Sequence, residues 1–264
     1  MTRCSPAERA RPDFHVLIPA RLGSSRLPDK PLLPIAGRPL IEWVWQCARA
    51  SGARSVVIAT DDERIRAAAA AFGADCVLTS SAHASGTDRI AEVVRARGLP
   101  ARDIVVNLQG DEPLMPPEAL AQVAALLAGN AAFDLATAAA PITSLDEFLD
   151  PNCVKVVGGA AGEALYFSRA PIPFPRDHAA GTQPTRHAGA LRHVGLYAYR
   201  VASLLRFATL EPSALERIER LEQLRALEHG MRIALLRLAA IPPAGVDTPQ
   251  DLERVRRELE ARPQ

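Results

Sequence analysis

Short apolar segments rich in Val, Ile and Leu alternate with segments of helical periodicity along the first half of the chain. Parallel strands that are covered on both faces give such apolar runs, and each needs a crossover helix before the next strand. The alternation therefore predicts an α/β fold of the Rossmann-like type, with an open, mostly parallel sheet and helices on both faces. The expected strands are residues 15–18, 55–60, 75–78, 104–108 and 134–138, and the expected helices are residues 40–50, 62–72, 88–97 and 117–127.

The pattern changes after about residue 140. A proline-rich loop lies between two of the later apolar segments, and strands there follow one another without a clear helix between them. The expected later strands are residues 154–157, 164–167, 194–199 and 232–238, and the expected later helices are residues 214–227 and 249–260.

The return of a strand and a helix at the end of the chain bears on the domain organisation. It indicates that the middle portion extends one domain and does not form a second one. We therefore expect a single α/β domain over residues 13–264 with a small β-rich insertion at about residues 150–212. Residues 1–12 contain proline and charge but no apolar run, which is typical of a flexible extension.

The charge balance limits the partners that this protein can attract. The chain has 31 Lys and Arg residues against 30 Asp and Glu, a formal net charge of +1, so we expect neither nucleic acid nor anionic lipid as a partner. No run of 18 uncharged apolar residues is present, so no membrane insertion is expected. The cysteines (Cys4, Cys47, Cys76 and Cys153) form no CxxC pair, which favours a reducing, cytoplasmic setting over a disulfide framework or a zinc site.

A cluster of positive side chains follows the first expected strand. Arg21, Arg26 and Lys30 lie there in the sequence IPARLGSSRLPDKPL, among small residues whose amides and hydroxyls can approach phosphate oxygens. Ligands bind beyond the carboxyl ends of the strands in open parallel sheets, so this loop is the expected binding site. It matches neither the GxxxxGK[ST] nor the GxGxxG pattern. The loop predicts phosphate binding, and the alternative is a solvated basic loop.

Two acidic residues are candidate metal ligands. Asp111 follows the fourth expected strand in VVNLQGDEPLM, at the same sheet edge as the basic loop. Mg²⁺ takes one or two protein carboxylates and keeps its other positions for phosphate and water, so Asp111 suits a metal–triphosphate complex. Asp247, in GVDTPQDLERV, is a second candidate far along the chain. Taken alone, its position before Thr248 and Pro249 favours a helix N-cap instead.

Seven segments, in order, carry a resemblance to a known family. They are IPARLGSSRLPDKPL, SAHASGTDRIAEV, VVNLQGDEPLM, ALYFSRAPIP, LRHVGLYAYR, LERIERLEQLRAL and GVDTPQDLERVR, and they span about residues 15–257. The chain resembles the 3-deoxy-manno-octulosonate (Kdo) cytidylyltransferases, within the wider family of sugar-acid cytidylyltransferases. The first of these motifs is shared with the acylneuraminate enzymes, whereas its combination with the later motifs is specific.

The resemblance implies a nucleotide site with a bound metal ion. It assigns Mg²⁺ to Asp111 and Asp247, against the N-cap interpretation, and makes these acids catalytic together with Arg21 and Lys30. The implied nucleotide-binding residues are Pro19, Ala20, Arg21, Ser24, Lys30, Ser85, Gly86 and Gln109, the last at the cytosine or ribose. Asp29 departs from the family, because many relatives carry glycine there. Its charge is expected to lower triphosphate affinity only weakly, since an exposed carboxylate is well screened.

The resemblance also implies a sugar-acid site. Its residues are Arg26, Arg89, His193, Tyr197, Glu222 and Gln223, with Arg89 facing the carboxylate of the sugar acid. Without the resemblance, His193 and Tyr197 are more simply structural groups on a strand. The pattern around Glu222 and Gln223 likewise favours the solvated face of an amphipathic helix.

These features together imply a transferase that joins CTP to Kdo, giving CMP-Kdo and pyrophosphate for lipopolysaccharide synthesis. No residue is evident as a general base, so we expect Mg²⁺ to activate the attacking sugar hydroxyl. A homodimer is also implied, through the proline-rich segment and the strand that contains Tyr197. Three alternatives remain: a cytidylyltransferase for sialic acid or 8-amino-Kdo, a nucleotide-sugar glycosyltransferase, whose usual DxD pair is missing, and a non-catalytic CTP-binding module.

Overall fold

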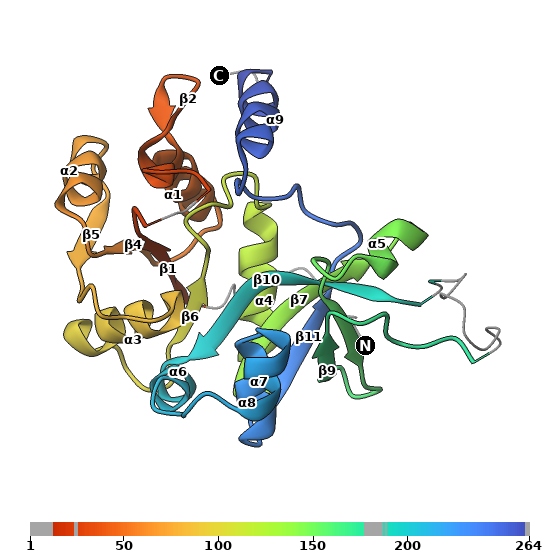
Figure 1. Cartoon of the computed structure of the whole chain (residues 1–264). Coiled ribbons are helices and arrows are strands. Elements are labelled where there is room, and N and C mark those ends of the chain that lie inside the picture. The colour runs from red at the N-terminus through yellow and green to blue at the C-terminus, as the bar shows by residue number, and fades with distance from the viewer. Residues whose placement is uncertain (1–12, 24–25, 177–186, 188, 262–264) are drawn as a thin grey trace, which may run out of the picture.

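A central sheet organises the protein in this computed structural model, which describes residues 13–23, 26–176, 187 and 189–261 (Figure 1). The main strands lie side by side in the order β11-β7-β10-β6-β1-β4-β5. Their bounds are β1 (Phe14–Ala20), β4 (Ser55–Thr60), β5 (Asp75–Leu78), β6 (Ile104–Asn107), β7 (Leu135–Pro141), β10 (Leu191–Arg200) and β11 (Ile233–Arg237). A hairpin of β8 (Lys155–Gly158) and β9 (Ala164–Ser168) extends the sheet from β10, and β2 (Pro34–Ile35) with β3 (Arg38–Pro39) forms a separate small ribbon.

The direction of the strands determines where the loops meet. Strand β10 runs antiparallel to both β6 and β7, whereas the other neighbouring pairs in this order are parallel. The loops that follow β1, β4, β5, β6 and β11 therefore open at one edge of the sheet. The expected α/β fold is confirmed. The segment expected as an insertion contributes β10 to the interior of the sheet as well as the β8–β9 hairpin, because the pairing of a strand depends on distant segments and not on its own pattern.

Helices cover both faces of the sheet. Helices α1, α2 and α4 pack on the face that carries Val16 and Ile18, and α3, α6 and α8 pack on the face that carries Leu17 and Val105. The bounds are α1 (Leu40–Ala50), α2 (Glu63–Ala71), α3 (Gly86–Arg97), α4 (Pro117–Ala128), α5 (Leu145–Leu149), α6 (Val201–Phe207), α7 (Ala214–Glu219), α8 (Gln223–Glu228) and α9 (Pro249–Glu260). Burial of apolar side chains on both faces explains why the strands have continuous apolar runs.

One expected helix is divided in two. The sequence pattern predicts a continuous helix over residues 214–227, but Arg220 takes a left-handed conformation (φ 54°) and separates α7 from α8. Arg169 stabilises this break, because its guanidinium donates to the backbone carbonyl of Glu219 at 2.7 Å and so satisfies an open end of α7. The periodicity of the segment gives no sign of this contact, because Arg169 directly follows β9, about fifty residues earlier in the chain.

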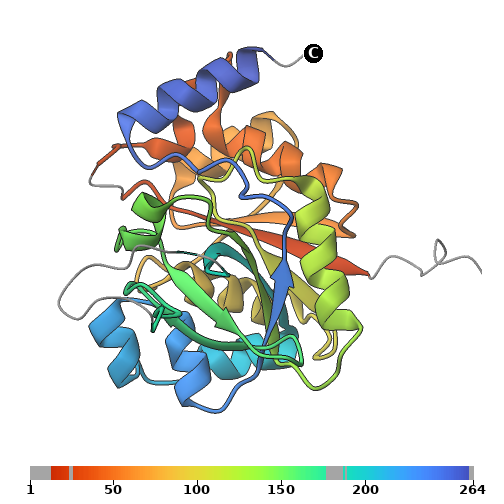
Figure 2. The ribbon, with the colours of Figure 1, turned by 90° about the vertical axis from the view of Figure 1, so that its right-hand side faces the viewer.

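The last helix lies beside the N-terminal part of the chain. Figure 2 shows α9 next to the segments that surround β2 and α1. Val246 and Val255 pack there with Leu40 and Leu114 in a small buried cluster. This packing returns the end of the chain to the loops after β1 and β6. Within the described ranges, no helix is both long and apolar enough to cross a membrane.

Candidate active site

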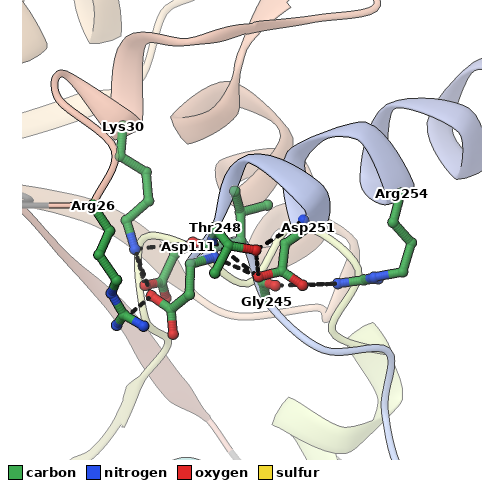
Figure 3. Close-up of polar contacts among 9 residues, drawn as sticks. Arg26, Lys30, Asp111, Gly245, Thr248, Asp251 and Arg254 are labelled. Carbon is green, nitrogen blue, oxygen red and sulfur yellow. Dashed lines mark hydrogen bonds and ion pairs between the residues drawn. The ribbon is translucent and has the colours of Figure 1, made fainter.

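Lys30 connects three separate segments of the chain. It begins a short 3-10 turn, η2 (Lys30–Leu32), in the loop after β1. Its ammonium donates to Asp111 Oδ2 at 2.6 Å, to Asp247 Oδ1 at 3.1 Å and to the carbonyl of Val246 at 2.9 Å (Figure 3). Burial by itself would lower the pKa of Lys30, but Asp111 and Asp247 together raise it above its ordinary value of 10.5. Lys30 is therefore a fixed positive charge at neutral pH.

Asp111 and Asp247 converge from distant parts of the sequence. Asp111 follows β6, and Asp247 lies between β11 and α9. The two carboxylates accept from the same ammonium, and the guanidinium of Arg26 lies 3.7 Å from Asp247. The N-cap interpretation of Asp247 is wrong, because the hydroxyl of Thr248 caps α9. The carboxylate of Asp247 is thereby left for the site.

The two acids suit a hard divalent cation. They supply carboxylate oxygens, which Mg²⁺ prefers, and their contact with one ammonium shows that they lie close enough to share a cation. Among the described residues, no group of three or more His, Cys, Asp and Glu side chains is placed to hold a metal ion. A metal at Asp111 and Asp247 would therefore take its remaining ligands from water and a bound phosphate, as Mg²⁺ commonly does.

A cavity of about 370 Å³ opens beside these charges. Its walls come from the loop after β1, the N-terminal end of α3 and the loop after β6. The residues predicted from the sequence that line it are Pro19, Ala20, Arg21, Arg26, Lys30, Ser85, Gly86, Arg89, Gln109, Asp111 and Asp247. Ser24 lies outside the described residues. The cavity is large enough for a small-molecule ligand.

Two glycines allow the walls of the cavity to approach each other. A β-carbon on Gly110 would lie 2.7 Å from the carbonyl oxygen of Pro19, and one on Gly86 would lie 3.1 Å from the side chain of Pro19. Any larger residue at Gly110 would push the loop after β6 away from β1. Gly110 therefore sets the spacing between Asp111 and the basic loop.

The residues expected at the sugar acid lie around this cavity rather than in one place. His193 lines a second cavity of about 230 Å³, which shares Asp111 and Asp247 with the first. Glu222 lines a shallow hollow on the other side of Ser85. Arg26 and Arg89 line the first cavity itself.

His193 is held as a neutral imidazole. Its Nε2 lies 2.9 Å from the hydroxyl of Thr137, and its ring packs against Phe167 and Tyr197 with centroid separations of 5.0 and 5.5 Å. Burial lowers the pKa of His193 to about 3. A neutral imidazole can exchange hydrogen bonds with a hydroxyl group, but it brings no positive charge to an anionic ligand.

Glu222 and Gln223 stand at the start of α8 and are turned inward. The hydroxyl of Thr87 donates to Glu222 Oε2 at 2.7 Å, and burial raises the pKa of Glu222. Glu222 Oε1 and Gln223 Nε2 are buried with no hydrogen-bond partner in the described part of the chain. The interpretation of this pair as a solvated helix face is therefore wrong. Buried polar atoms are nearly always paired, so these two are exceptions among the described residues, and Glu222 also lines the hollow beside Ser85.

Comparisons with known proteins identify the family. The sequence model of the cytidylyltransferase family matches residues 15–233. A 3-deoxy-manno-octulosonate cytidylyltransferase from Cellvibrio japonicus is 54% identical over 250 residues, which is 94% of this chain and 98% of that protein. The enzyme of the same name from Polynucleobacter necessarius subsp. necessarius is 54% identical over 253 residues, or 96% and 98% of the two chains. The chain belongs to the 3-deoxy-manno-octulosonate cytidylyltransferase family.

One solved structure agrees with this assignment to the Kdo cytidylyltransferases, and a more distant one shares the fold. A CMP:2-keto-3-deoxy-manno-octonic acid synthetase in complex with CTP superposes with a TM-score of 0.84 at 42% identity, covering 94% of this chain and 98% of that one. A cytidylyltransferase from Leptospira borgpetersenii shares the fold with a TM-score of 0.61 at 17% identity, covering 96% and 89% of the two chains.

Arg89 of this Kdo cytidylyltransferase family member has a partner that the sequence analysis missed. Its guanidinium donates to Asp61 Oδ2 at 2.8 Å and to the hydroxyl of Thr79 at 2.6 Å, and its side chain is only 4% exposed. Asp61 follows β4 and Thr79 follows β5, so Arg89 is fixed across two strand ends. The position of Asp61 directly after an apolar run was the available signal.

Glu112 is a second residue that the sequence analysis did not assign. It follows Asp111 directly, and burial, together with the nearby charges of Asp111 and Asp247, raises its pKa to about 7. Arg192, which lines the second cavity together with Glu112, opposes this shift of the pKa. A carboxyl group of this kind adds negative potential to the acidic side of the site when it ionises.

The unusual Asp29 has a backbone explanation. Its φ of 54° is left-handed, which glycine adopts without strain and which Asp tolerates better than most residues. Its carboxylate lies 3.4 Å from the guanidinium of Arg64, so its charge is partly offset by a residue of α2. This pairing supports the expectation that Asp29 affects the triphosphate site only weakly.

Proposed function

We propose that this protein transfers the CMP group of CTP to Kdo and releases pyrophosphate. The names of its close relatives and the bound CTP of a similar solved structure support this function. The observation that carries it is the convergence of Asp111 and Asp247 on Lys30, in the wall of a cavity lined by further cations. In this proposal the two acids form a metal-binding pair beside a phosphate-binding surface.

The positive side chains are suited to neutralise the charge of the triphosphate. In-line attack of a sugar hydroxyl on the α-phosphorus needs positioning and charge neutralisation more than a covalent intermediate. Arg21 and Lys30 line the cavity and are suited to offset charge on the departing pyrophosphate. Gln109 also lines the cavity and is suited to contact the cytosine or the ribose.

Asp111 and Asp247 would hold Mg²⁺ in this proposal. When bound, Mg²⁺ supplies charge neutralisation and lowers the pKa of a coordinated hydroxyl group. Lys30 keeps the two carboxylates together and compensates their mutual repulsion before substrates bind. Our proposal assigns no general base for the sugar hydroxyl, so that proton passes to solvent.

The sugar acid would bind between the triphosphate and the inward-facing polar groups. Glu222 Oε1 and Gln223 Nε2 offer an acceptor and a donor, and His193 and Tyr197 follow on β10. Arg89 lines the cavity and would face the sugar-acid carboxylate in this proposal, while Asp61 and Thr79 hold its guanidinium in place. Neutral hydrogen-bonding groups of this kind suit the hydroxyls of Kdo.

We also propose a cytoplasmic homodimer whose product is used in lipopolysaccharide synthesis. Large apolar side chains are exposed on the hairpin, the proline-rich segment and α7, namely Leu165 (55%), Phe174 (61%) and Ile218 (76%). Strand β10 lies inside the sheet, so the surface supporting this proposal differs from the Tyr197 strand expected from the sequence. Light scattering at two protein concentrations tests the assembly, and a constant monomer mass would contradict it.

A pyrophosphate-release assay tests the activity. Purified protein is supplied with CTP, Mg²⁺ and one of Kdo, 8-amino-Kdo or sialic acid, with and without EDTA. We expect release with Kdo that chelation abolishes. Faster pyrophosphate release with another sugar acid would show that this acid, and not Kdo, is the preferred substrate. CTP binding without pyrophosphate release in the presence of any of these acceptors would favour a non-catalytic module.

A further inference from the structure

The carboxylate of Asp247 stands on a segment with no regular secondary structure. This segment connects the end of β11 to the start of α9, and the side chain of Asp247 is 57% exposed. An exposed side chain on an irregular segment has many accessible rotamers and backbone states. A metal-binding role therefore requires other contacts that fix the backbone of Asp247.

Asp251, in the first turn of α9, supplies one set of such contacts. Its Oδ2 accepts from the backbone amide of Asp247 at 3.2 Å, from the amide of Thr248 at 3.0 Å and from the hydroxyl of Thr248 at 2.8 Å. The Thr248 contacts form an ordinary capping box. The bond to Asp247 reaches one residue beyond that box and links the helix directly to the backbone of the acid.

Arg254, one turn further along α9, holds the preceding residues. Its guanidinium donates to the carbonyls of Ala244 at 2.6 Å and Gly245 at 3.2 Å, and it lies 3.4 Å from Asp251 Oδ1. On the opposite side, the amide of Val246 donates to the carbonyl of Asp111 at 2.8 Å. The segment is thus held between the loop of one acid and the helix that follows the other, as Figure 3 shows.

The helix that provides these contacts is itself anchored. Val255 and Leu259 of α9 are buried with Val246 and with Leu114, which lies in the same loop as Asp111. The polar contacts of Asp251 and Arg254 therefore start from a fixed element, and the position of Asp247 is tied to that of Asp111.

We propose that Asp251 and Arg254 are positioning residues that place the carboxylate of Asp247 opposite Asp111. The inference rests on the proposed function, because it assumes that these two acids bind a divalent cation. Residues that orient metal ligands commonly change metal affinity or activity by about 10- to 100-fold when they are replaced.

The test measures Mn²⁺ binding by electron paramagnetic resonance on protein loaded with CTP and without any sugar acid, so that no turnover occurs. We expect Asp251→Ala and Arg254→Ala each to weaken Mn²⁺ binding by about tenfold, in the same direction as Asp247→Ala. Asp251→Asn keeps one acceptor oxygen, and Arg254→Lys keeps a charge, so both are expected to recover part of the affinity. These conservative variants also keep the test decisive if an alanine variant fails to fold.

Ser213→Ala is the matched control. Ser213 caps α7 through the same type of capping box, with Glu216 in the place of Asp251, and Figure 1 shows α7 at the opposite end of the molecule from α9. This variant is expected to lose thermal stability, because a helix cap is removed, while its Mn²⁺ affinity stays unchanged. A loss of Mn²⁺ affinity in Ser213→Ala equal to that in Asp251→Ala would show a general effect of destabilisation and overturn the proposal.

The remaining outcomes separate this inference from the proposed function. Wild-type Mn²⁺ affinity in folded Asp251→Ala and Arg254→Ala, with weak binding in Asp247→Ala, would overturn the positioning role alone. Wild-type affinity in Asp247→Ala would overturn both the metal assignment and the inference. If no sugar acid leads to pyrophosphate release from CTP but Mn²⁺ binding changes as expected, the proposed reaction is overturned and the positioning role is supported.

Discussion

A β-carbon on Gly245 would lie 2.7 Å from the backbone carbonyl oxygen of Asp111. It would also lie 3.2 Å from the carboxyl group of Glu112. The segment that carries Asp247 therefore packs against the loop of Asp111 with no room for a side chain. This close approach allows Val246 to donate its amide to Asp111 and brings the two acids to the same place.

Replacement of Gly245 is expected to separate the two acids. In Gly245→Ala the methyl group must displace backbone on one side, since the nearest atom is a carbonyl oxygen and not the end of a flexible side chain. We expect kcat/KM to fall by roughly 10²-fold, the scale of a displacement of about 1 Å in a preorganised site. Steady-state pyrophosphate release measures the effect. A folded variant with the wild-type rate would show that the close approach has no role.

Removal of Asp111 is expected to affect turnover far more than folding. Asp111→Ala deletes a proposed metal ligand and leaves the Lys30 ammonium with Asp247 and a carbonyl. Turnover should fall by about 10² or more, which is typical of the loss of one preorganised electrostatic group. Circular dichroism and the pyrophosphate-release rate together check this. Near-wild-type turnover in a correctly folded variant would contradict the role of Asp111.

Glu222 is expected to act on the sugar acid and not on the nucleotide. Glu222→Gln keeps an acceptor for the hydroxyl of Thr87. It removes the negative charge at Oε1, which is buried and has no partner among the described residues and which a sugar hydroxyl would contact. We expect KM for Kdo to rise by roughly tenfold, as for the loss of one hydrogen bond to a charged group, while KM for CTP stays constant. Glu228→Gln, an exposed change on the same helix, is the control. Equal changes in both KM values would argue against a sugar site here.

His193 predicts an acid-dependent loss of stability. Its pKa falls from an ordinary 6.5 to about 3 on folding, because burial disfavours the charged imidazole. Between pH 6.5 and pH 3 the unfolded chain therefore binds a proton at His193 that the folded chain does not bind. The free energy of unfolding falls as the pH drops through this range. Urea unfolding at several pH values, compared with His193→Gln, measures this contribution. Parallel pH profiles for the two proteins would show that His193 is not buried in its neutral form.

Local patterns predicted much of the fold. The bounds expected for α1, β4, β5 and α9 agree with the structure, because each combines a clear apolar period with a cap or a turn at its ends. The local sequence pattern gave a wrong prediction where a tertiary contact determined the structure instead. Arg169, which directly follows β9, stabilises the break between α7 and α8, and β10 pairs in the middle of the sheet although it belongs to the expected insertion.

The sequence indicated which residues belong to the candidate site better than it indicated which of them contact one another. Motifs at the ends of strands indicated Lys30 and Asp111, since ligands gather at that edge of a parallel sheet. Local pattern alone assigned Asp247 to a helix cap, and it left out Asp61, which pairs with the buried Arg89. A carboxylate that follows a strand looks the same in sequence whether it pairs with an arginine, caps a helix or binds a metal ion.

The sequence by itself determined the alternation of strands and helices and the types of charged group at the strand ends, because these follow from periodicity over a few residues. Only the tertiary structure decided that Asp247 meets Asp111 across Lys30 and that Thr248, not Asp247, caps α9. Those contacts join residues that lie far apart in the chain, and they depend on the packing of α9 and on the absence of a side chain at Gly245. No local pattern records such packing, because its energy arises only after the segments have come together.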